Sequence, residues 1–88
     1  MLVSIDDFAP TFPRPLTDAE RERASLLLGE AEDRIREEFA REGKDFDAEL
    51  KRVPWLPVTA RRVIREMVSA VVIIGPDAGR RQSAVSAG

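Results

Sequence analysis

Residues 57–76 read PVTARRVIREMVSAVVIIGP, and this stretch decides the fold. Pro57 suits the first turn of a helix, and Gly75-Pro76 stops one. The segment ends in Val71-Val72-Ile73-Ile74, which is apolar on every side of its last turn. A helix with one face in water is apolar on one side only, so this end must be covered by the rest of the chain or by another chain.

The two sides of this predicted helix differ in character. Seven apolar residues are expected to form its buried face: Val58, Val63, Ile64, Met67, Val68, Val71 and Val72. Three arginines, Arg61, Arg62 and Arg65, are expected on the opposite side. Arginine suits subunit interfaces because its guanidinium pairs with a carboxylate through two hydrogen bonds and is weakly hydrated. A solvated face, or salt bridges within the chain, is the simpler alternative for these arginines.

A longer helix is predicted upstream, from residue 18 to residue 41 or 42. Thr17 and Glu20 form the two ends of a capping box, and Gly43 is a natural C-cap. An apolar stripe follows helical spacing through Ala24, Leu27, Leu28, Ala31, Ile35 and Phe39. Opposite charges four residues apart are expected to support the solvent side, as in Glu30–Arg34, Glu32–Arg36 and Glu37–Arg41.

Shorter elements accompany these two helices. Ser4 caps a predicted helical turn, and three prolines then lead into a connector whose expected anchors are Ile5, Phe8, Phe12 and Leu16. Asp45 caps a second brief turn, which carries Phe46, Leu50 and Val53. We therefore predict an all-α fold: a small bundle of two main antiparallel helices, one or two short helices and a flexible C-terminal tail. The predicted division is a helical domain over residues 1–79 and a tail over residues 80–88.

Trp55 is the single tryptophan, and it stands between Pro54 and Pro57. The prolines force an extended stretch before the next helix. One interpretation makes Trp55 a core residue whose ring closes the base of a small helical domain. The other makes it an exposed anchor of an interface, because tryptophan is enriched among the residues that dominate binding energy.

The composition excludes several classes of site. The chain has no Cys, His or Tyr, which excludes disulfides, zinc sites built on Cys or His, and the usual general base near neutral pH. The sequence contains no nucleophile elbow, Walker A loop, dinucleotide-binding glycine motif or EF-hand loop. We therefore expect no enzyme activity and no cofactor. A core built from 88 residues barely offsets the entropy of ordering the chain, and oligomerisation is the remaining means of stabilising it.

Charge is divided between the two parts of the chain. Residues 1–50 hold 14 acids and 7 bases (net −7), whereas residues 51–88 hold 2 acids and 7 bases (net +5), which gives −2 in total. Such a chain can associate head to tail if its acidic patch faces a neighbour's basic patch. The candidate acids lie on the long helix: Glu30, Asp33, Glu37 and Glu38. The alternative is neutralisation within the chain, with the basic helix packed beside the acidic one.

Neither a membrane nor sequence-specific DNA is an expected partner. The N-terminus is acidic, and the longest apolar-rich run, residues 67–74, falls far short of the roughly 20 residues that cross a bilayer. We therefore expect a soluble protein made in a cytoplasm. Arg80 and Arg81 add to the basic residues of the second half. A pI of about 5.2 and the lack of an aromatic platform beside the arginines argue against sequence-specific recognition.

Five segments occur in an order that resembles a known family. They are Val3-Ser4-Ile5-Asp6-Asp7-Phe8, Pro15-Leu16-Thr17-Asp18-Ala19-Glu20, the stretch from Leu27 to Arg36, the stretch from Pro57 to Val68, and the stretch from Gly75 to Ser83. Together they resemble the small head-to-tail connector (adaptor) proteins of long-tailed bacteriophages and their prophages. Each segment alone consists mostly of helix caps and core spacing. Their order and spacing carry the resemblance, which covers nearly the whole chain.

The resemblance implies a structural, all-α virion protein that is neither an enzyme nor dependent on a cofactor. Copies of such a protein form a ring, usually of twelve subunits, beneath the portal protein. The ring extends the channel through which DNA passes and docks the next neck or tail-completion protein. Its place is the virion neck, and the host cytoplasm before assembly. The alternative is a small bacterial helical module, unrelated to phage, that binds proteins or associates with DNA.

Two features depart from the family pattern. Gly75 stands before Pro76 where family members usually have Asn, and the chain reaches Gly88 without the Gly-aromatic-Ser segment that often follows the basic tail. If that segment contacts the portal, this chain makes the contact differently or is a shortened prophage copy. The candidate subunit interface comprises Arg61, Arg62, Arg65, Glu30, Asp33, Glu37, Glu38, Trp55, Val71, Val72 and Ile74. The candidate tail contacts are Arg80 and Arg81, and we expect the tail to order only against the portal or a neighbour.

Overall fold

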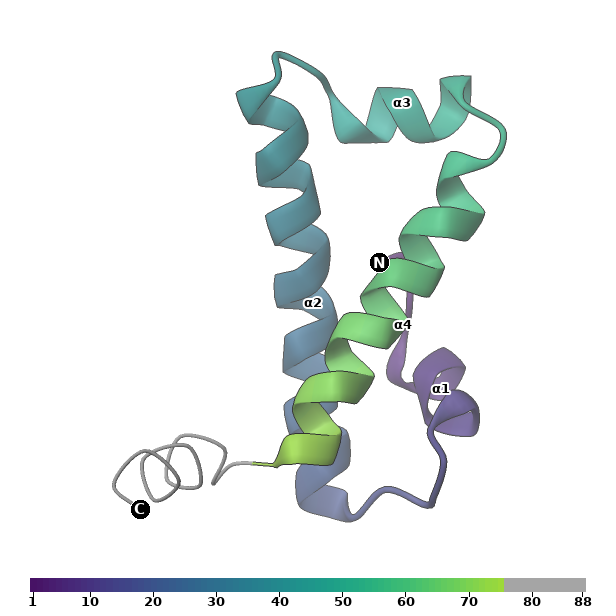
Figure 1. Ribbon diagram of the computed structural model, residues 1–88, viewed down its shortest axis with the longest axis vertical. Helices are drawn as coiled ribbons and strands as arrows, with labels where there is room; N and C mark the ends of the chain where they lie inside the picture. The colour runs from purple at the N-terminus through teal and green to yellow at the C-terminus, as the bar shows by residue number, and fades with distance from the viewer. Residues whose placement is uncertain (76–88) are drawn as a thin grey trace, which may run out of the picture.

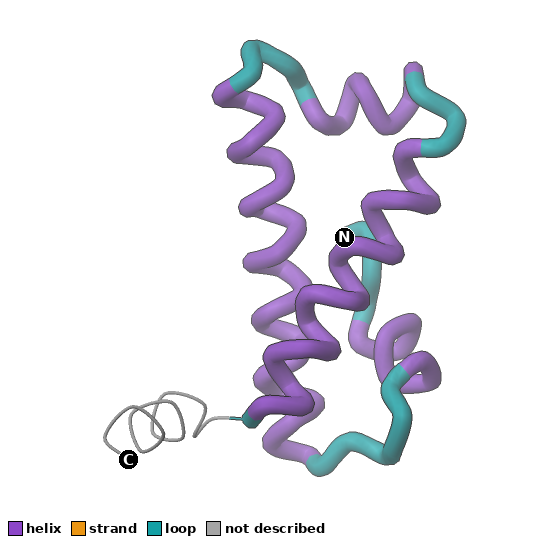
Figure 2. Tube along the Cα trace, in the orientation of Figure 1, coloured by secondary structure: helices purple, strands orange, loops and turns teal. Residues whose placement is uncertain are grey.

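The computed structural model describes residues 1–75, and it is built from helices joined by short connections (Figure 1). Their order is α1 (Ile5–Phe8), the 3-10 helix η1 (Ala9–Thr11), α2 (Asp18–Arg41), α3 (Phe46–Arg52) and α4 (Leu56–Ile74). Residues 1–75 contain no strand (Figure 2). The all-α prediction is therefore confirmed. The predicted tail over residues 80–88, the boundary at residue 79 and the contacts assigned to Arg80 and Arg81 lie outside the described residues.

The two long helices run antiparallel, as predicted. Helix α4 crosses α2 near the N-terminal end of α2, and the two diverge toward the opposite end, where the short α3 bridges them (Figure 1). Helix α1 contacts α2, and its buried Phe8 belongs to a core cluster that also contains Ile64 and Val68 of α4. The N-terminal segment thus closes one flank of the helix pair.

Local capping explains where the helices start. Ser4 and Thr17 each begin a helix through a capping box. At α2, the Thr17 hydroxyl accepts from the Glu20 backbone N–H at 3.1 Å, and the Glu20 carboxylate accepts from the Thr17 backbone N–H at 2.9 Å. Asp45 caps α3 in a similar way, through a bond from the Asp47 backbone N–H. These side chains satisfy backbone donors that a helix leaves unpaired at its first turn.

Glycine ends both long helices. Helix α2 has Glu42 as its C-cap and is followed by Gly43 with φ of 73°, and α4 ends at Gly75 with φ of 83°. A positive φ costs glycine little because it has no Cβ, so the chain can reverse at these points. Pro57 lies in the first turn of α4, where its missing N–H would have no partner within the helix.

The core consists of two adjoining clusters. The larger joins the N-terminal segment to α2 and α4, and its buried residues are Val3, Phe8, Phe12, Ala24, Leu28, Ala31, Ile64, Val68 and Val72. The smaller fills the angle between α3 and α4 with Phe46, Leu56 and Ala60, and the partly buried Phe39 of α2 packs against it. The predicted anchors of the N-terminal segment belong to the first cluster, so that segment is part of the fold.

The buried face of α4 differs from the predicted one. Every fourth residue is buried: Leu56, Ala60, Ile64, Val68 and Val72. The predictions that Val58, Val63, Met67 and Val71 lie in this face are wrong, because all four are exposed. Residues spaced by four form a single ridge along a helix, and α2, α3 and the N-terminal segment pack against that ridge.

Trp55 is not a core residue. Its side chain is 65% exposed, so the interpretation of its ring as the base of the domain is wrong. Trp55 is the N-cap of α4 and has helical backbone angles, so the predicted extended stretch is a turn instead. The neighbouring Leu56 is the residue that turns inward. Leu56 and Phe46 close that end of the core instead.

Candidate functional site

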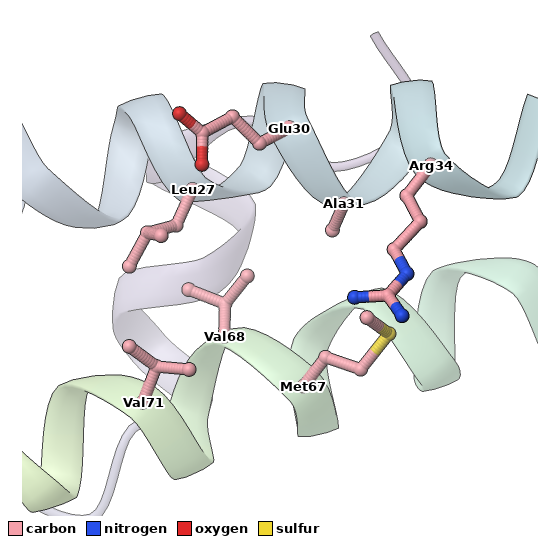
Figure 3. Close-up of a pocket in the computed structure, with 7 residues that line it drawn as sticks. All are labelled: Leu27, Glu30, Ala31, Arg34, Met67, Val68 and Val71. Carbon is pink, nitrogen blue, oxygen red and sulfur yellow. The ribbon is translucent and has the colours of Figure 1, made fainter. Parts of the chain in front are cut away.

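A groove runs between α2 and α4 on the flank that the N-terminal segment leaves open (Figure 3). Its volume is about 210 Å³. Most of its lining is apolar, and the residues that line it are Leu27, Glu30, Ala31, Arg34, Met67, Val68 and Val71. Ala31 and Val68 are buried and form the floor, whereas Met67 and Val71 are 37% and 38% exposed. The groove therefore presents apolar walls to solvent.

The last turn of α4 extends this apolar surface. Val72 is buried, but Val71, Ile73 and Ile74 are all exposed. Helical spacing places Val63, Met67, Val71 and Ile74 along one side of α4, since they recur at intervals of three or four residues. Within the described chain, this turn is thus covered only at Val72. Contiguous exposed apolar surface of this kind typically marks an interaction site.

Two charged residues border the groove without an ion pair. Glu30 and Arg34 were predicted to pair across one turn of α2, but the structure forms no salt bridge or hydrogen bond between them. Arg34 reaches across the opening toward Met67, while the Glu30 carboxylate lies above Leu27 (Figure 3). Neither side chain has an ionic partner among residues 1–75. Both are therefore free to contact a molecule that enters the groove.

The arginines of α4 do not form a common outer face. Arg62 is exposed, whereas Arg61 and Arg65 are half-buried and lie near α1, so their predicted position opposite the buried face is wrong. The two act on Asp7, whose pKa is lowered mainly by hydrogen bonds from the Ser4 backbone and side chain and further by the positive charges of Arg61 and Arg65. The Nε of Arg61 is buried and has no hydrogen-bond partner within residues 1–75.

A second, shallower hollow lies on the arginine side of α4. Arg62 and Arg65 line it together with Thr11, Glu66, Ser69, Ala70 and Ile73. None of the three α4 arginines makes a salt bridge in the part of the chain that the structure describes. The basic helix does pack beside the acidic one, as the alternative of neutralisation within the chain expected, but no salt bridge joins α4 to α2 within residues 1–75.

The candidate acids of α2 are exposed, and three of them pair along their own helix. Asp33 lies 3.6 Å from Arg36, and Glu37 and Glu38 lie 2.9 Å and 3.5 Å from Arg41. Such exposed pairs contribute little stability and exchange partners easily. Glu30 differs from them because it borders the groove and has no ion pair in the described region.

A network of ion pairs centred on Arg36 joins α2 to α3. Arg36 joins α2 to α3 by donating to Glu32 at 3.2 Å and to Asp47 at 3.0 Å, and its guanidinium lies 5.6 Å from the centre of the Phe46 ring. The hydrogen bond to Asp47 is the main cause of its raised pKa. This contact holds the start of α3 against α2.

Sequence reasoning identified only part of this surface. It named Glu30 and Val71 as interface candidates, and the groove brings them together; it assigned Arg34 only to a solvent-side ion pair, and Leu27 and Met67 only to buried stripes. The three consecutive leucines at positions 26–28 were the available signal, because one helix stripe cannot bury all of them. Leu26 is indeed exposed, on a different part of the α2 surface.

A family model described as phage protein Gp19/Gp15/Gp42 matches residues 12–88. The chain belongs to this family of phage proteins. The match includes α2, α3 and α4, and with them every residue of the groove. No curated protein and no solved structure matches the chain.

The described region carries none of the features of two other site classes. No helix among residues 1–75 combines the length and apolarity needed to cross a membrane. The same residues bring together no group of three or more metal-binding side chains. The main exposed apolar features of the described residues are the groove and the side chain of Trp55.

Proposed function

We propose that this chain is a structural protein of the virion neck, a head-to-tail connector subunit that acts without catalysis. Its copies form a ring beneath the portal protein, and twelve subunits are the usual number in the proteins that the sequence resembles. The ring docks the next neck or tail-completion protein, and DNA passes through its channel. No membrane takes part.

The observation that carries this proposal is the exposed apolar flank of α4 in a chain from a phage family. Val63, Met67, Val71 and Ile74 all remain accessible after the rest of residues 1–75 has packed. A small protein that leaves such a surface uncovered gains stability when another chain covers it. Oligomerisation in a particle supplies that cover.

Charge supports the same arrangement. Residues 51–75 carry five bases and one acid, whereas α2 carries eight acids and five bases. In a ring of identical subunits, each contact joins two different surfaces, so a basic surface of one copy can meet an acidic surface of the next. The exposed Arg62 and the acids Glu30, Asp33, Glu37 and Glu38 are the residues available for such a contact.

A nonsense mutation in the gene, in a phage that carries it, tests the proposal. Without the protein, infected cells should contain complete heads and complete tails that do not join, visible by electron microscopy. Supplying the protein from a plasmid should restore joined particles. Normal virions from the mutant, or absence of the chain from purified wild-type particles by mass spectrometry, would exclude a role in the neck. If the chain is absent from virions, its association with host DNA or host proteins would favour the alternative, a small bacterial helical module unrelated to phage.

A further inference from the structure

The structure contains an exposed tryptophan, Trp55, and an apolar groove on the same chain. We call the side chain of Trp55 the knob. We propose that the indole ring of Trp55 from one copy inserts into the groove between α2 and α4 of the next copy. This inference rests on the proposed function in one respect: both require copies of the chain to associate. It goes further by assigning the residues on each side of the contact.

The knob is rigid and accessible. Trp55 is 65% exposed, and its backbone is held between Pro54 and the helix that begins at Leu56. Val58 and Arg62, both exposed, lie three and seven residues further along α4 and so share a side of the helix with Trp55. A fixed backbone reduces the entropy lost when the ring is immobilised in a partner. Tryptophan beside arginine is also the composition typical of residues that dominate interfaces.

The groove has a suitable size for this ring. A cavity of about 150 Å³ lined by apolar side chains accepts benzene. The groove measures about 210 Å³, which leaves room for the second ring of an indole. Its floor is formed by the small Ala31 and by Val68, and its walls by Leu27, Met67 and Val71. A large flat side chain can therefore enter between the two helices without displacing the core.

The polar groups at the groove match an indole. A buried indole N–H requires a hydrogen-bond acceptor, and Glu30 offers a carboxylate that has no ion pair within residues 1–75. The guanidinium of Arg34, likewise without an ion pair in that region, extends over the opening and can lie against the ring face (Figure 3). The thioether of Met67 provides a favourable contact with the ring edge.

The contact must join two copies. Met67 lies twelve residues beyond Trp55, which is about 18 Å along a rigid helix. Val71 lies nine residues beyond Arg62, which places it half a turn away on the opposite side of α4. One chain therefore cannot fill its own groove, and each copy keeps a free knob and a free groove at different positions. Such contacts repeat head to tail and close into a ring when the rotation allows.

Fluorescence tests the insertion directly, because Trp55 is the single tryptophan and the chain has no tyrosine. On raising the concentration of the full chain from micromolar to millimolar, Trp55 emission should move to shorter wavelength in step with a rise in sedimentation coefficient. Trp55→Ala should weaken self-association by about 30-fold or more, as expected for an interface tryptophan. Leu26→Ala, which removes an equally exposed apolar side chain outside the groove, should leave it unchanged.

Mixing two variants tests the direction of the contact. Trp55→Ala has a groove but no knob, whereas Met67→Glu has a knob but a charged, obstructed groove. Each should be monomeric alone and should keep wild-type helicity by circular dichroism. Together they should form a dimer that cannot extend, with emission from the Met67→Glu copy shifted to shorter wavelength. Arg34→Ala, used in place of Met67→Glu, should reduce association without obstructing the groove. The comparison separates the contribution of the arginine contact to the ring from the steric effect of blocking the groove.

Several outcomes would overturn the insertion. They are a wild-type chain that stays monomeric at millimolar concentration, a Trp55→Ala variant that associates like wild type, and a variant mixture that stays monomeric. The second outcome would indicate groove-to-groove pairing or occupation by a portal segment. Joined virions from phage carrying Trp55→Ala would refute the insertion and leave the connector role intact. If the chain is absent from virions but the two variants still form dimers when mixed, the connector role would be refuted and the insertion would stand.

Discussion

Glu20 shows how one side chain fixes the start of a helix. It accepts from both terminal nitrogens of Arg14, at 2.8 Å and 2.7 Å, and from the Thr17 backbone N–H at 2.9 Å. The hydrogen bonds from Arg14 are the main cause of its low pKa, which falls from 4.5 to about 2. Because the folded-state pKa is depressed, this carboxylate stabilises the fold above pH 4.5 and loses that effect as the pH falls toward 2.

The thermal stability of a Glu20→Gln variant tests this role of the carboxylate. Glu20→Gln should lower the Tm at neutral pH and should flatten the fall in Tm between pH 5 and pH 2, since the amide does not titrate. Circular dichroism melts across this range provide the measurement. Glu22→Gln is the matched control, because Glu22 is exposed on the same helix and makes no salt bridge within residues 1–75. Equal pH profiles for wild type and Glu20→Gln would contradict the role of this carboxylate.

Arg62 is the exposed arginine of the α4 trio, and it lies beside the proposed knob. Arg62→Glu should weaken self-association roughly fivefold, which corresponds to about 1 kcal/mol for a partly exposed ionic contact. Helicity should not change. Sedimentation velocity at low and high salt measures the effect, and the difference from wild type should shrink at high salt. Lys44→Glu, an exposed charge reversal in the α2–α3 connection, should behave like wild type.

At the scale of the element, α4 separates a structural face from an exposed one. Ile64 is fully buried in the larger core cluster, whereas Val58 is exposed near the start of the same helix. Ile64→Ala should destabilise the subunit by about 2–5 kcal/mol because it removes buried methylene groups and leaves a cavity. Val58→Ala should change stability by no more than about 0.5 kcal/mol. Urea unfolding of the monomer measures both, and similar losses for the two variants would argue against this division of α4.

The helix ends were predictable because their causes are local. Thr17, Glu20 and Gly43 determine the limits of α2 through bonds and dihedral angles that involve only nearby residues. The buried face of α4 was not predictable in the same way. Apolar residues occupy more than one side of this helix, and the choice of Ala60 over Met67 for the core depends on where α2 and α3 approach. The hydrophobicity of a side chain shows that it can be buried. The packing of the other helices determines whether it is buried.

The candidate site was predictable only in its outline. The apolar end of α4 and the excess of acids on α2 are visible in the sequence, and both contribute to the surface found in the structure. The groove itself depends on the crossing of two helices, and no spacing rule reveals it. The exposure of Trp55 was not predictable from spacing either. It depends on the direction in which α4 starts, and that direction turns Leu56 inward and leaves Trp55 in solvent.

At the scale of the whole molecule, the N-terminal segment is part of the core. Val3 and Phe8 are almost completely buried against α2 and α4. Deletion of residues 1–11 should therefore remove several kcal/mol, a large share of the roughly 5–15 kcal/mol that holds a typical domain together. We expect loss of a cooperative thermal transition by circular dichroism. Asp6→Asn, which weakens an exposed salt bridge to Arg21 in the same segment, should retain the transition.

The same segment bears on the timing of events in an infected cell. Because Phe8 and Phe12 complete one flank of α4 from within the chain, this flank needs no cover from a sister molecule. Folding and joining then become separate events. Under the proposed function, subunits that have already folded along this flank can accumulate before they join, and we expect joining to depend on their concentration.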